Sequence, residues 1–414
     1  MKKLNLSLLI STFFLLTILA RLIAAYFFAD TRLDNEWGKL VHNLEFSGIL
    51  GINVVIDEFT AIHKFANSKD VVLPSAFMPP LYGYFIYYVK VLLANSFDLI
   101  KVIIFIQIIL SLTSIYLFFK ITRKFENLYF SLGLSFLFSF FPMYVYSSVQ
   151  ISSIILQIFL LLCFFHFLLI FIENKKILNL IYFSIFSGLL ILVRGEFILF
   201  YLITLAYFFL YHNKNFKALF LSLIIATIIL SPYLKRNYNY FDTIVLTKSF
   251  GHNILKGNNP DLKVEGSGKY ISNQKDLKIK TNNYYEIELD NYYRNEAFKN
   301  IKENPKIYLI LYFKKVFSFL FFDLNSTYPG YYSIFHILPK IVLSILSFCG
   351  AIVVLRKKSF FQFLSIYYFS NILLFSIFFI LPRYSLILLP IQLLLSVQFI
   401  KIILKKLNFK NEII

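Results

Sequence analysis

The chain is dominated by long apolar runs that alternate with short polar stretches and with two longer polar segments. The apolar runs cover residues 4–28, 81–94, 99–119, 128–146, 151–172, 177–193, 197–211, 218–234, 307–322, 337–355, 360–381 and 384–404. A bilayer core about 30 Å thick is crossed by roughly 20 helical residues, so many of these runs are candidate transmembrane helices. With 58% hydrophobic and only 15% charged residues, the composition excludes a soluble globular protein. The expected fold class is an all-α polytopic membrane protein.

The charges between the runs indicate how many of them cross the membrane. If all twelve cross, three short basic loops lie outside, against the positive-inside rule. These loops contain Lys120, Arg123 and Lys124, then Lys175 and Lys176, then Lys214 and Lys217. Runs 81–94 and 307–322 are short and contain Lys90, Lys314 and Lys315, as expected for helices lying on the membrane surface. With those two at the surface, about ten helices cross and the three loops face the cytoplasm; twelve is the alternative.

The ten-span arrangement leaves two long segments outside. The chain then divides into an N-terminal transmembrane module, 1–235, with a first exterior loop at about 29–98, a second exterior loop with a surface helix at 236–335, and C-terminal transmembrane helices at 336–414. The polar stretch 258–304 is too long for a plain connector. It predicts a small exterior subdomain, with 282–304 partly helical.

The net charge of +19 suggests nucleic acid as a partner in a soluble protein, but here much of it lies in short loops that orient the helices. Nucleic-acid binding is therefore not expected. Cys163 and Cys349 fall within apolar runs, so no disulfide framework is indicated. His63, His252 and His336 show no metal-ligand spacing, so no metal site is predicted, although a divalent cation remains a possible cofactor.

Three arginines mark the exterior ends of predicted spans. Arg194 and Arg236 follow apolar runs, and Arg383 precedes the last one. Guanidinium groups converging near the headgroups suit a phosphate, because each donates two parallel hydrogen bonds to its oxygens. The alternative is that each arginine merely extends toward the interface. Arg21 lies deeper in the first run, where a structural pairing with an acid is expected.

Two carboxylates, Asp34 and Glu36, emerge directly from the first span. An inverting sugar transfer needs a carboxylate that takes the proton of the attacking hydroxyl, and cations that stabilise the departing phosphate. On chemistry alone, two acids on a surface loop are more often solvated than catalytic. Other exterior acids are Asp30, Asp57, Glu58 and Glu196.

Several short motifs resemble one known superfamily. They are Leu-Asp-Asn-Glu-Trp at 33–37 with Leu-Val-His-Asn-Leu at 40–44, Met-Pro-Pro-Leu-Tyr at 78–82, Ser-Gly-Leu-Leu-Ile-Leu-Val-Arg-Gly-Glu at 187–196, Pro-Tyr-Leu-Lys-Arg-Asn-Tyr at 232–238 with Gly-Asn-Asn-Pro at 257–260, and Arg-Tyr-Ser-Leu at 383–386 with Pro390. In this order they resemble the GT-C membrane glycosyltransferases, especially bacterial relatives of the polyprenyl-phosphate-mannose protein mannosyltransferases and of the lipid A aminoarabinose transferase.

The resemblance implies a GT-C-like bundle with two long exterior loops and an inverting hexosyl- or pentosyltransferase. It implies a polyprenyl phosphate sugar donor, an acceptor that is protein, lipid or glycan, and a site on the periplasmic face of a bacterial inner membrane. Asp34 becomes the general-base candidate and Glu36 its neighbour. The candidate phosphate contacts are Arg194, Arg236, Arg383 and Tyr384.

The sequence also departs from the family pattern. Asp34 lies one residue closer to Trp37 than expected, so the catalytic role can belong to Asp30 or Glu36 instead. Gly195 replaces the usual proline, and the turn at 146–152 has no carboxylate where relatives often carry one. A lipid-linked glycan flippase and a non-catalytic subunit with this fold are the alternative functions. The two extended exterior segments favour an enzyme.

Overall fold

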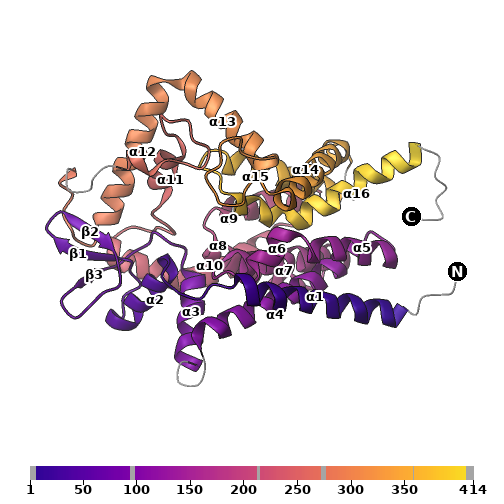
Figure 1. Cartoon of the computed structure of the whole chain (residues 1–414), viewed down its shortest axis with the longest axis horizontal. Coiled ribbons are helices and arrows are strands. Elements are labelled where there is room, and N and C mark those ends of the chain that lie inside the picture. The colour runs from indigo at the N-terminus through magenta and orange to yellow at the C-terminus, as the bar shows by residue number, and fades with distance from the viewer. Residues whose placement is uncertain (1–5, 94–97, 212–214, 272–276, 358, 407–414) are drawn as a thin grey trace.

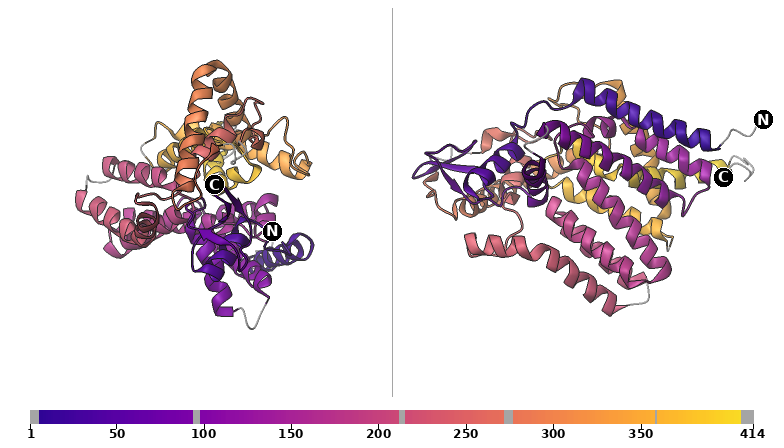
Figure 2. Two further views of the ribbon diagram at one scale, coloured as in Figure 1. Left: turned by 90° about the vertical axis from the view of Figure 1, so that its left-hand side faces the viewer. Right: turned by 90° about the horizontal axis from the view of Figure 1, so that it is seen from below.

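The computed structural model describes residues 6–93, 98–211, 215–271, 277–357 and 359–406; Lys214 lies outside these ranges. Most described residues are helical, and the helices form an elongated bundle. The first and last described residues, 6 and 406, lie near one end of this bundle, and a small sheet lies at the opposite end (Figure 1). The right-hand view of Figure 2 shows the same elongated arrangement, and the left-hand view looks along the long axis from the end with the sheet. We call the end with the sheet the exterior end, following the predicted topology.

Six helical segments in the described chain are long and apolar enough to cross a membrane. They are α1 (Leu6–Phe28), α4 (Leu99–Thr122), α7 (Ile154–Asn174), α10 (Phe216–Phe241), α14 (Ile334–Val354), and the 3₁₀ helix η3 (Pro382–Leu388) with α16 (Leu389–Lys406). Four shorter apolar helices are α5 (Leu128–Ser139), α8 (Ile177–Val193), α9 (Phe197–Tyr211) and α15 (Phe360–Phe375). These correspond to the ten runs expected to cross. The polytopic helical class is confirmed, and the number of spans stays a prediction.

The two runs expected at the surface form α3 (Pro80–Leu93) and α13 (Pro305–Leu320). Neither belongs to the groups of candidate spans in the described chain. Helix α13 descends from the exterior end toward α15 (Figure 1). Its exposed side chains include Ile310, Phe313 and Phe317. An apolar helix with an exposed aromatic face beside a membrane bundle is compatible with the expected surface position.

The predicted run 128–146 does not form one helix. Helix α5 ends at Ser139, and a separate short helix, α6 (Pro142–Ser147), follows. Pro142 is the cause, because it lacks an N–H and is best accommodated in the first turn of a helix. The break places the turn at 146–152 beside the start of the first exterior segment, where the backbone N–H of Asp30 donates to Val149 O at 3.3 Å.

The first exterior segment contains α2 (Glu36–Ser47) and a three-stranded antiparallel sheet that sequence patterns did not predict. The strands are β1 (Asn53–Asp57), β2 (Thr60–His63) and β3 (Val71–Leu73), in the order β2-β1-β3. Each strand has only three to five residues. The sheet buries Val54 and Val72 at its centre, and β-branched residues of this kind suit a pleated surface.

The second exterior segment contains α11 (Phe250–Gly257), the 3₁₀ turn η1 (Gly268–Tyr270) and α12 (Tyr285–Glu303), so the helix expected within 282–304 is confirmed. Helices α11 and α12 pack backbone against backbone, because a Cβ on Gly251 would lie 1.9 Å from Asp290 O. Thr281 Oγ1 donates to Asp57 O at 2.7 Å, which joins this segment to the sheet. The two exterior segments therefore form one unit over the bundle.

Arg21 is fully buried, but the expected pairing with an acid is wrong. Its guanidinium donates to Ser111 Oγ at 2.7 Å, Thr17 O at 3.1 Å and Ser139 O at 3.2 Å, and it lies 5.5 Å from the Tyr144 ring centre. Three neutral acceptors and one aromatic face thus replace a carboxylate among the described residues. Arg21 holds α1 against α4 and α5.

Candidate active site

The loop that carries the two predicted carboxylates is fixed by a helix cap. The Asn35 side chain accepts from the N–H groups of Trp37 at 3.1 Å and Gly38 at 3.2 Å, and donates to Ile151 O at 3.3 Å. Glu36 is consequently the first residue of α2, at the end of the helix that favours negative charge. Asp34 and Glu36 are both exposed, and neither makes a hydrogen bond or an ion pair to another described residue.

The residues behind this loop hold it in place. The Trp37 ring packs edge-on against Tyr82 with ring centres 5.0 Å apart, and Tyr82 donates to Gln107 Oε1 at 2.9 Å. Asp30 accepts from the backbone N–H of Ile151 at 2.6 Å. The structure thus uses Asp30, an alternative for the catalytic role, to tie the loop to the turn at 146–152. Asp34 and Glu36 remain accessible.

Glu36 is the predicted acid that the structure brings near cationic residues of other elements. Burial lowers the pKa of Lys256 on α11, the Glu36 carboxylate raises it, and Arg383 lowers it again. His63 on β2 responds to the same acid: removal from water lowers the pKa of His63, Lys39 lowers it further, and Glu36 raises it. Glu36 therefore interacts with the sheet on one side and with α11 on the other.

Lys256 was not predicted, and packing defines its position. Its ammonium lies 4.6 Å from the Phe379 ring centre. The next residue, Gly257, has no room for a side chain, because a Cβ there would lie 2.5 Å from the Phe378 and Phe379 backbone. The buried Lys315 donates to Gly257 O at 3.3 Å, Asn258 Oδ1 at 3.0 Å and Ile377 O at 3.1 Å. These contacts fix α11 to the turn before η3.

Arg194, Arg383 and Tyr384 come together, as expected. The Arg194 guanidinium lies 5.1 Å from the Tyr384 ring centre and 5.4 Å from that of Phe375, and its Nε lies 3.7 Å from a carboxylate oxygen of Glu196. The charges of Arg194 and Arg383 both act on Tyr384. Arg383 is exposed and also interacts with Lys256. Basic groups from three elements are therefore linked electrostatically: Arg194 and Arg383 through Tyr384, and Arg383 and Glu36 through Lys256.

Arg236 does not join this group. Its guanidinium donates to Ser75 O at 2.9 Å, Leu50 O at 2.5 Å and Asn237 Oδ1 at 2.7 Å. It also lies over the Tyr240 ring, 4.9 Å from the ring centre. With its donors directed at backbone carbonyls, Arg236 anchors the first exterior segment to α10. A phosphate contact by Arg236 has no support in this geometry.

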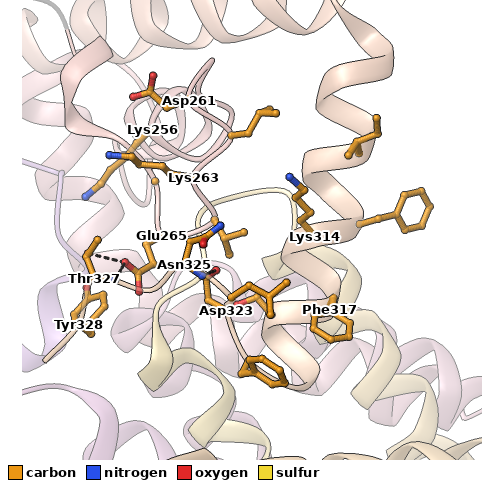
Figure 3. A pocket seen from close by; sticks show the side chains of 18 of the residues that line it. Lys256, Asp261, Lys263, Glu265, Lys314, Phe317, Asp323, Asn325, Thr327 and Tyr328 are labelled. Atoms are coloured by element: carbon orange, nitrogen blue, oxygen red, sulfur yellow. Dashed lines mark hydrogen bonds between the residues drawn. The ribbon is translucent and has the colours of Figure 1, made fainter. Parts of the chain in front are cut away.

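A pocket of about 1050 Å³ adjoins Lys256. Figure 3 shows Lys256, Lys263 and Lys314 around it, with Asp323 and Asn325 near its centre. Its apolar wall comes from exposed side chains of α13, Ile310, Phe313 and Phe317. On the opposite side, Glu265 accepts from the Thr327 N–H at 3.0 Å and the Thr327 hydroxyl at 2.8 Å, which joins two loops of the wall. The pocket combines apolar surface with three lysines and three carboxylates, those of Asp261, Glu265 and Asp323.

Two acids on α12 hold the exterior unit together, Glu286 to the first exterior segment and Asp290 to α11, and no sequence motif identified them. The buried Glu286 accepts from Asn53 Nδ2 at 2.5 Å, Ser75 Oγ at 2.6 Å and Ala76 N at 2.8 Å. One turn later, Asp290 accepts from Gly251 N at 2.6 Å. Burial raises the pKa of Glu286 to about 7, although its hydrogen bonds lower it. The sequence did contain one signal for these acids: Glu286 and Asp290 are four residues apart, which places them on the same face of a helix as Tyr293 and Ala297. That face is the buried one.

The histidines of the exterior end are structural neighbours of this junction. The Phe77 ring lies between His63 and His252, with ring centres 5.8 Å and 5.4 Å away. Burial, together with the charges of Lys256 and His63, lowers the pKa of His252 to about 4. Among the described residues, no group of three or more His, Cys, Asp or Glu side chains has a geometry that holds a metal ion.

Comparisons with known proteins give matches in structure only. No family model and no curated protein matches the chain. The solved structure of the oligosaccharyltransferase AglB from Archaeoglobus fulgidus, in complex with an inhibitory peptide and a dolichol-phosphate, is similar with a TM-score of 0.56 and 13% identity over 96% of this chain. A second structure of the Archaeoglobus fulgidus oligosaccharyltransferase, tethered to an acceptor peptide, gives a TM-score of 0.55 and 15% identity over 97% of this chain.

This chain spans about half the length of those proteins, 50% and 51% respectively. The structure of ArnT from Cupriavidus metallidurans bound to undecaprenyl phosphate also matches, with a TM-score of 0.44 and 12% identity over 94% of this chain and 59% of ArnT. The similarity to the oligosaccharyltransferase shows that this integral membrane protein has a GT-C fold, as its motifs implied. At this level of identity the comparison establishes the fold alone.

Proposed function

We propose that the protein is an inverting glycosyltransferase that moves a sugar from a polyprenyl phosphate donor to an acceptor at the exterior end of the bundle. The observation that carries this proposal is that Glu36 is exposed, makes no hydrogen bond or ion pair to another described residue, and acts electrostatically on Lys256, as Arg383 also does. A carboxylate near cations supplies the two groups that sugar transfer from a phosphate requires.

In the proposed reaction, the acceptor hydroxyl or amide attacks the anomeric carbon as the carbon–oxygen bond to the phosphate breaks. The proton of the nucleophile goes to a carboxylate, and the negative charge that develops on the leaving phosphate is stabilised by basic side chains. Glu36 is favoured over Asp34 as the base, because Glu36 interacts with Lys256 and His63. Lys256, Arg383 and Arg194 are the candidate phosphate contacts.

The pocket beside Lys256 supports a lipid-linked donor. Its wall of Ile310, Phe313 and Phe317 suits an isoprenoid chain, and Lys256 and Lys314 lie where a phosphate attached to such a chain can be bound. The matched oligosaccharyltransferase structure contains a dolichol-phosphate, a ligand with the same combination of apolar chain and phosphate. A peptide, a lipid and a glycan all remain candidate acceptors.

The test uses the purified chain in liposomes with radiolabelled polyprenyl phosphate hexose or pentose and three acceptor classes: peptides, membrane lipids and glycans. We expect label in one acceptor class and none with Glu36→Gln, whereas Glu58→Gln, an exposed acid of the same segment, retains transfer. Movement of the labelled lipid across the bilayer without transfer indicates a flippase. Absence of both activities across all donors and acceptors contradicts the proposed enzyme and indicates a non-catalytic subunit. Repeating the assay with EDTA and with added Mg²⁺ or Mn²⁺ tests the divalent cation.

A further inference from the structure

A second pocket lies far from the candidate active site, at the bundle end that carries both termini. It measures about 380 Å³ and lies between the end of α7, the start of α8, the end of α9 and the start of α10. Two ion pairs and a hydrogen bond join helix ends at this side of the bundle. They are Lys124 with Glu173, Lys401 with Glu126, and the Tyr207 hydroxyl with Ser359 O.

Two lysines line this pocket, and the local backbone fixes both. Lys175 caps the C-terminus of α7 in the left-handed conformation, with φ of 54°, and its N–H donates to Phe171 O at 2.9 Å. Lys217 lies in the first turn of α10, where Asn215 Oδ1 accepts from Ala218 N at 3.1 Å. Neither ammonium makes a hydrogen bond or an ion pair within the described ranges of the chain.

Two other lysines at this end, Lys124 and Lys401, do form ion pairs. Lys124 contacts Glu173, and Lys401 lies 2.6 Å from a carboxylate oxygen of Glu126. No Asp or Glu lines the pocket that contains Lys175 and Lys217. Two ammonium groups without an acid leave a local positive charge, which favours an anionic ligand.

The remaining lining is apolar. Phe171, Leu180 and Phe208 form a buried floor, and Ile177 lies at the edge with 62% of its surface exposed. Helices α7 to α10 are candidate spans or short apolar helices, and Ile177 is the first residue of α8, so this edge lies at the end of an apolar helix. A ligand that fits both parts has an anionic head and an apolar tail.

We propose that this pocket binds an anionic phospholipid, with Lys175 and Lys217 at its phosphate and its acyl chains over Ile177. The proposal is independent of glycosyl transfer, because the pocket shares no residue with the candidate active site. The lysines face the leaflet on the side of the chain termini, and a basic residue near an anionic membrane surface contributes about 1 kcal/mol.

The experiment measures lipid binding to the purified full chain in detergent by native mass spectrometry. Wild-type protein is titrated with phosphatidylglycerol and with phosphatidylcholine, and we expect tighter binding of phosphatidylglycerol. The double variant Lys175→Gln/Lys217→Gln is expected to bind phosphatidylglycerol about 30-fold more weakly, from two contributions of about 1 kcal/mol. The control Lys176→Gln changes an exposed neighbour that does not line the pocket, and binding is expected to stay within about twofold.

Three results overturn the proposal: equal binding of the two lipids by wild type, equal phosphatidylglycerol binding by the double variant and the Lys176→Gln control, or full displacement of the lipid by about 10 mM inorganic phosphate. The last result identifies a free-anion site instead. The thermal midpoint of the double variant, measured with phosphatidylcholine alone, shows whether the variant is folded. If it is not folded, Lys175→Gln and Lys217→Gln are measured singly, each with an expected loss of about fivefold.

Discussion

The exterior end contains two groups of charged residues that differ in how their hydrogen-bonding capacity is used. The first, which we call the anchoring group, consists of Arg236, Glu286 and Asp290, whose charges are directed at backbone and side-chain groups of neighbouring segments. The second, the open group, consists of Glu36, Lys256, Arg383 and Arg194, which act electrostatically on one another or on Tyr384. Arg194 and Arg236 looked equivalent in sequence, yet one belongs to each group. A charged residue next to an apolar run is costly to bury, and the sequence shows only that cost. The partners of the side chain in the structure show whether it anchors a segment or is available to a ligand.

The largest expected effect separates the groups by activity. Glu36→Gln removes the proposed base and is expected to lower kcat by about 10²- to 10⁴-fold, about 3–5 kcal/mol. The free energy of unfolding is expected to fall by less than about 1 kcal/mol, because Glu36 is exposed and its stabilising charge lies at the N-terminus of α2. Transfer kinetics and thermal unfolding measure the two quantities. If Asp34→Asn produces this loss and Glu36→Gln does not, the base is Asp34 and the preference for Glu36 is wrong.

The next effect concerns the pH dependence of stability through Glu286. Its pKa is raised from 4.5 to about 7 by burial. Between these values the folded protein holds a proton that the unfolded chain has released, so the contribution of Glu286 to stability is complete below pH 4.5 and is lost as the pH rises through 7. The loss is about 3 kcal/mol.

Glu286→Gln removes this titration. The thermal midpoint of wild type minus that of the variant is therefore expected to fall as the pH rises from 5 to 8. His252 contributes with the opposite sign, because its lowered pKa favours stability above pH 6.5. Both proteins contain His252, so its contribution cancels when the midpoint of the variant is subtracted from that of wild type. Glu288→Gln, an exposed acid on the same helix, is the control. A wild-type-minus-variant difference that stays constant with pH contradicts the burial argument.

A smaller effect tests Arg236 as an anchor. Arg236→Gln loses the hydrogen bonds to Leu50 O and Ser75 O and is expected to reduce the free energy of unfolding by about 2 kcal/mol. Lys235→Gln changes the exposed preceding residue and is the matched control. A variant with wild-type stability and a raised KM for the donor returns Arg236 to the phosphate site and breaks the distinction between the groups.

The smallest effect concerns Lys256. Lys256→Gln is expected to raise the KM for the lipid donor about 10-fold, about 1.4 kcal/mol, because one charged contact with the phosphate is lost. Stability changes little, since the ammonium donates no hydrogen bond to a described residue and lies over the Phe379 ring. Lys269→Gln, an exposed lysine of η1, is the control. An unchanged donor KM with a raised acceptor KM assigns Lys256 to the acceptor.

The sequence predicted the helical framework well, because membrane-crossing helices need long apolar runs that few other structures share. The exterior end was less predictable. The short strands of 53–73 contain five residues at most, and their β-branched residues, such as Val54, Val55 and Val72, were a weak local signal. Strand pairing also depends on residues distant in sequence, so the local sequence rarely predicts such a sheet.

The candidate site shows the same limit. The predicted membrane topology identified Asp34, Glu36, Arg194 and Arg383 as candidates, because they lie beside apolar runs. Their assigned roles remain predictions. Lys256 lies in a polar segment where nothing local distinguishes it from Lys263. The position of Lys256 is set by tertiary packing: Gly257 packs against the Phe378 backbone, and Lys315 donates to Ile377 O. Contacts between segments over 50 residues apart cannot be read from spacing along one of them.

The burial of Arg21 has a consequence for the order of synthesis. Its partner on α4 lies 90 residues later in the chain, and its partner carbonyl at the end of α5 lies 118 residues later. Helix α1 is thus made with a permanently charged side chain whose acceptors do not yet exist, apart from Thr17 O one turn away. Until α4 and α5 have been inserted, most hydrogen-bond donors of the Arg21 guanidinium have no acceptor in the bilayer core. Helix α1 therefore reaches its final environment only after α5, whose Ser139 lies 118 residues beyond Arg21, has been made.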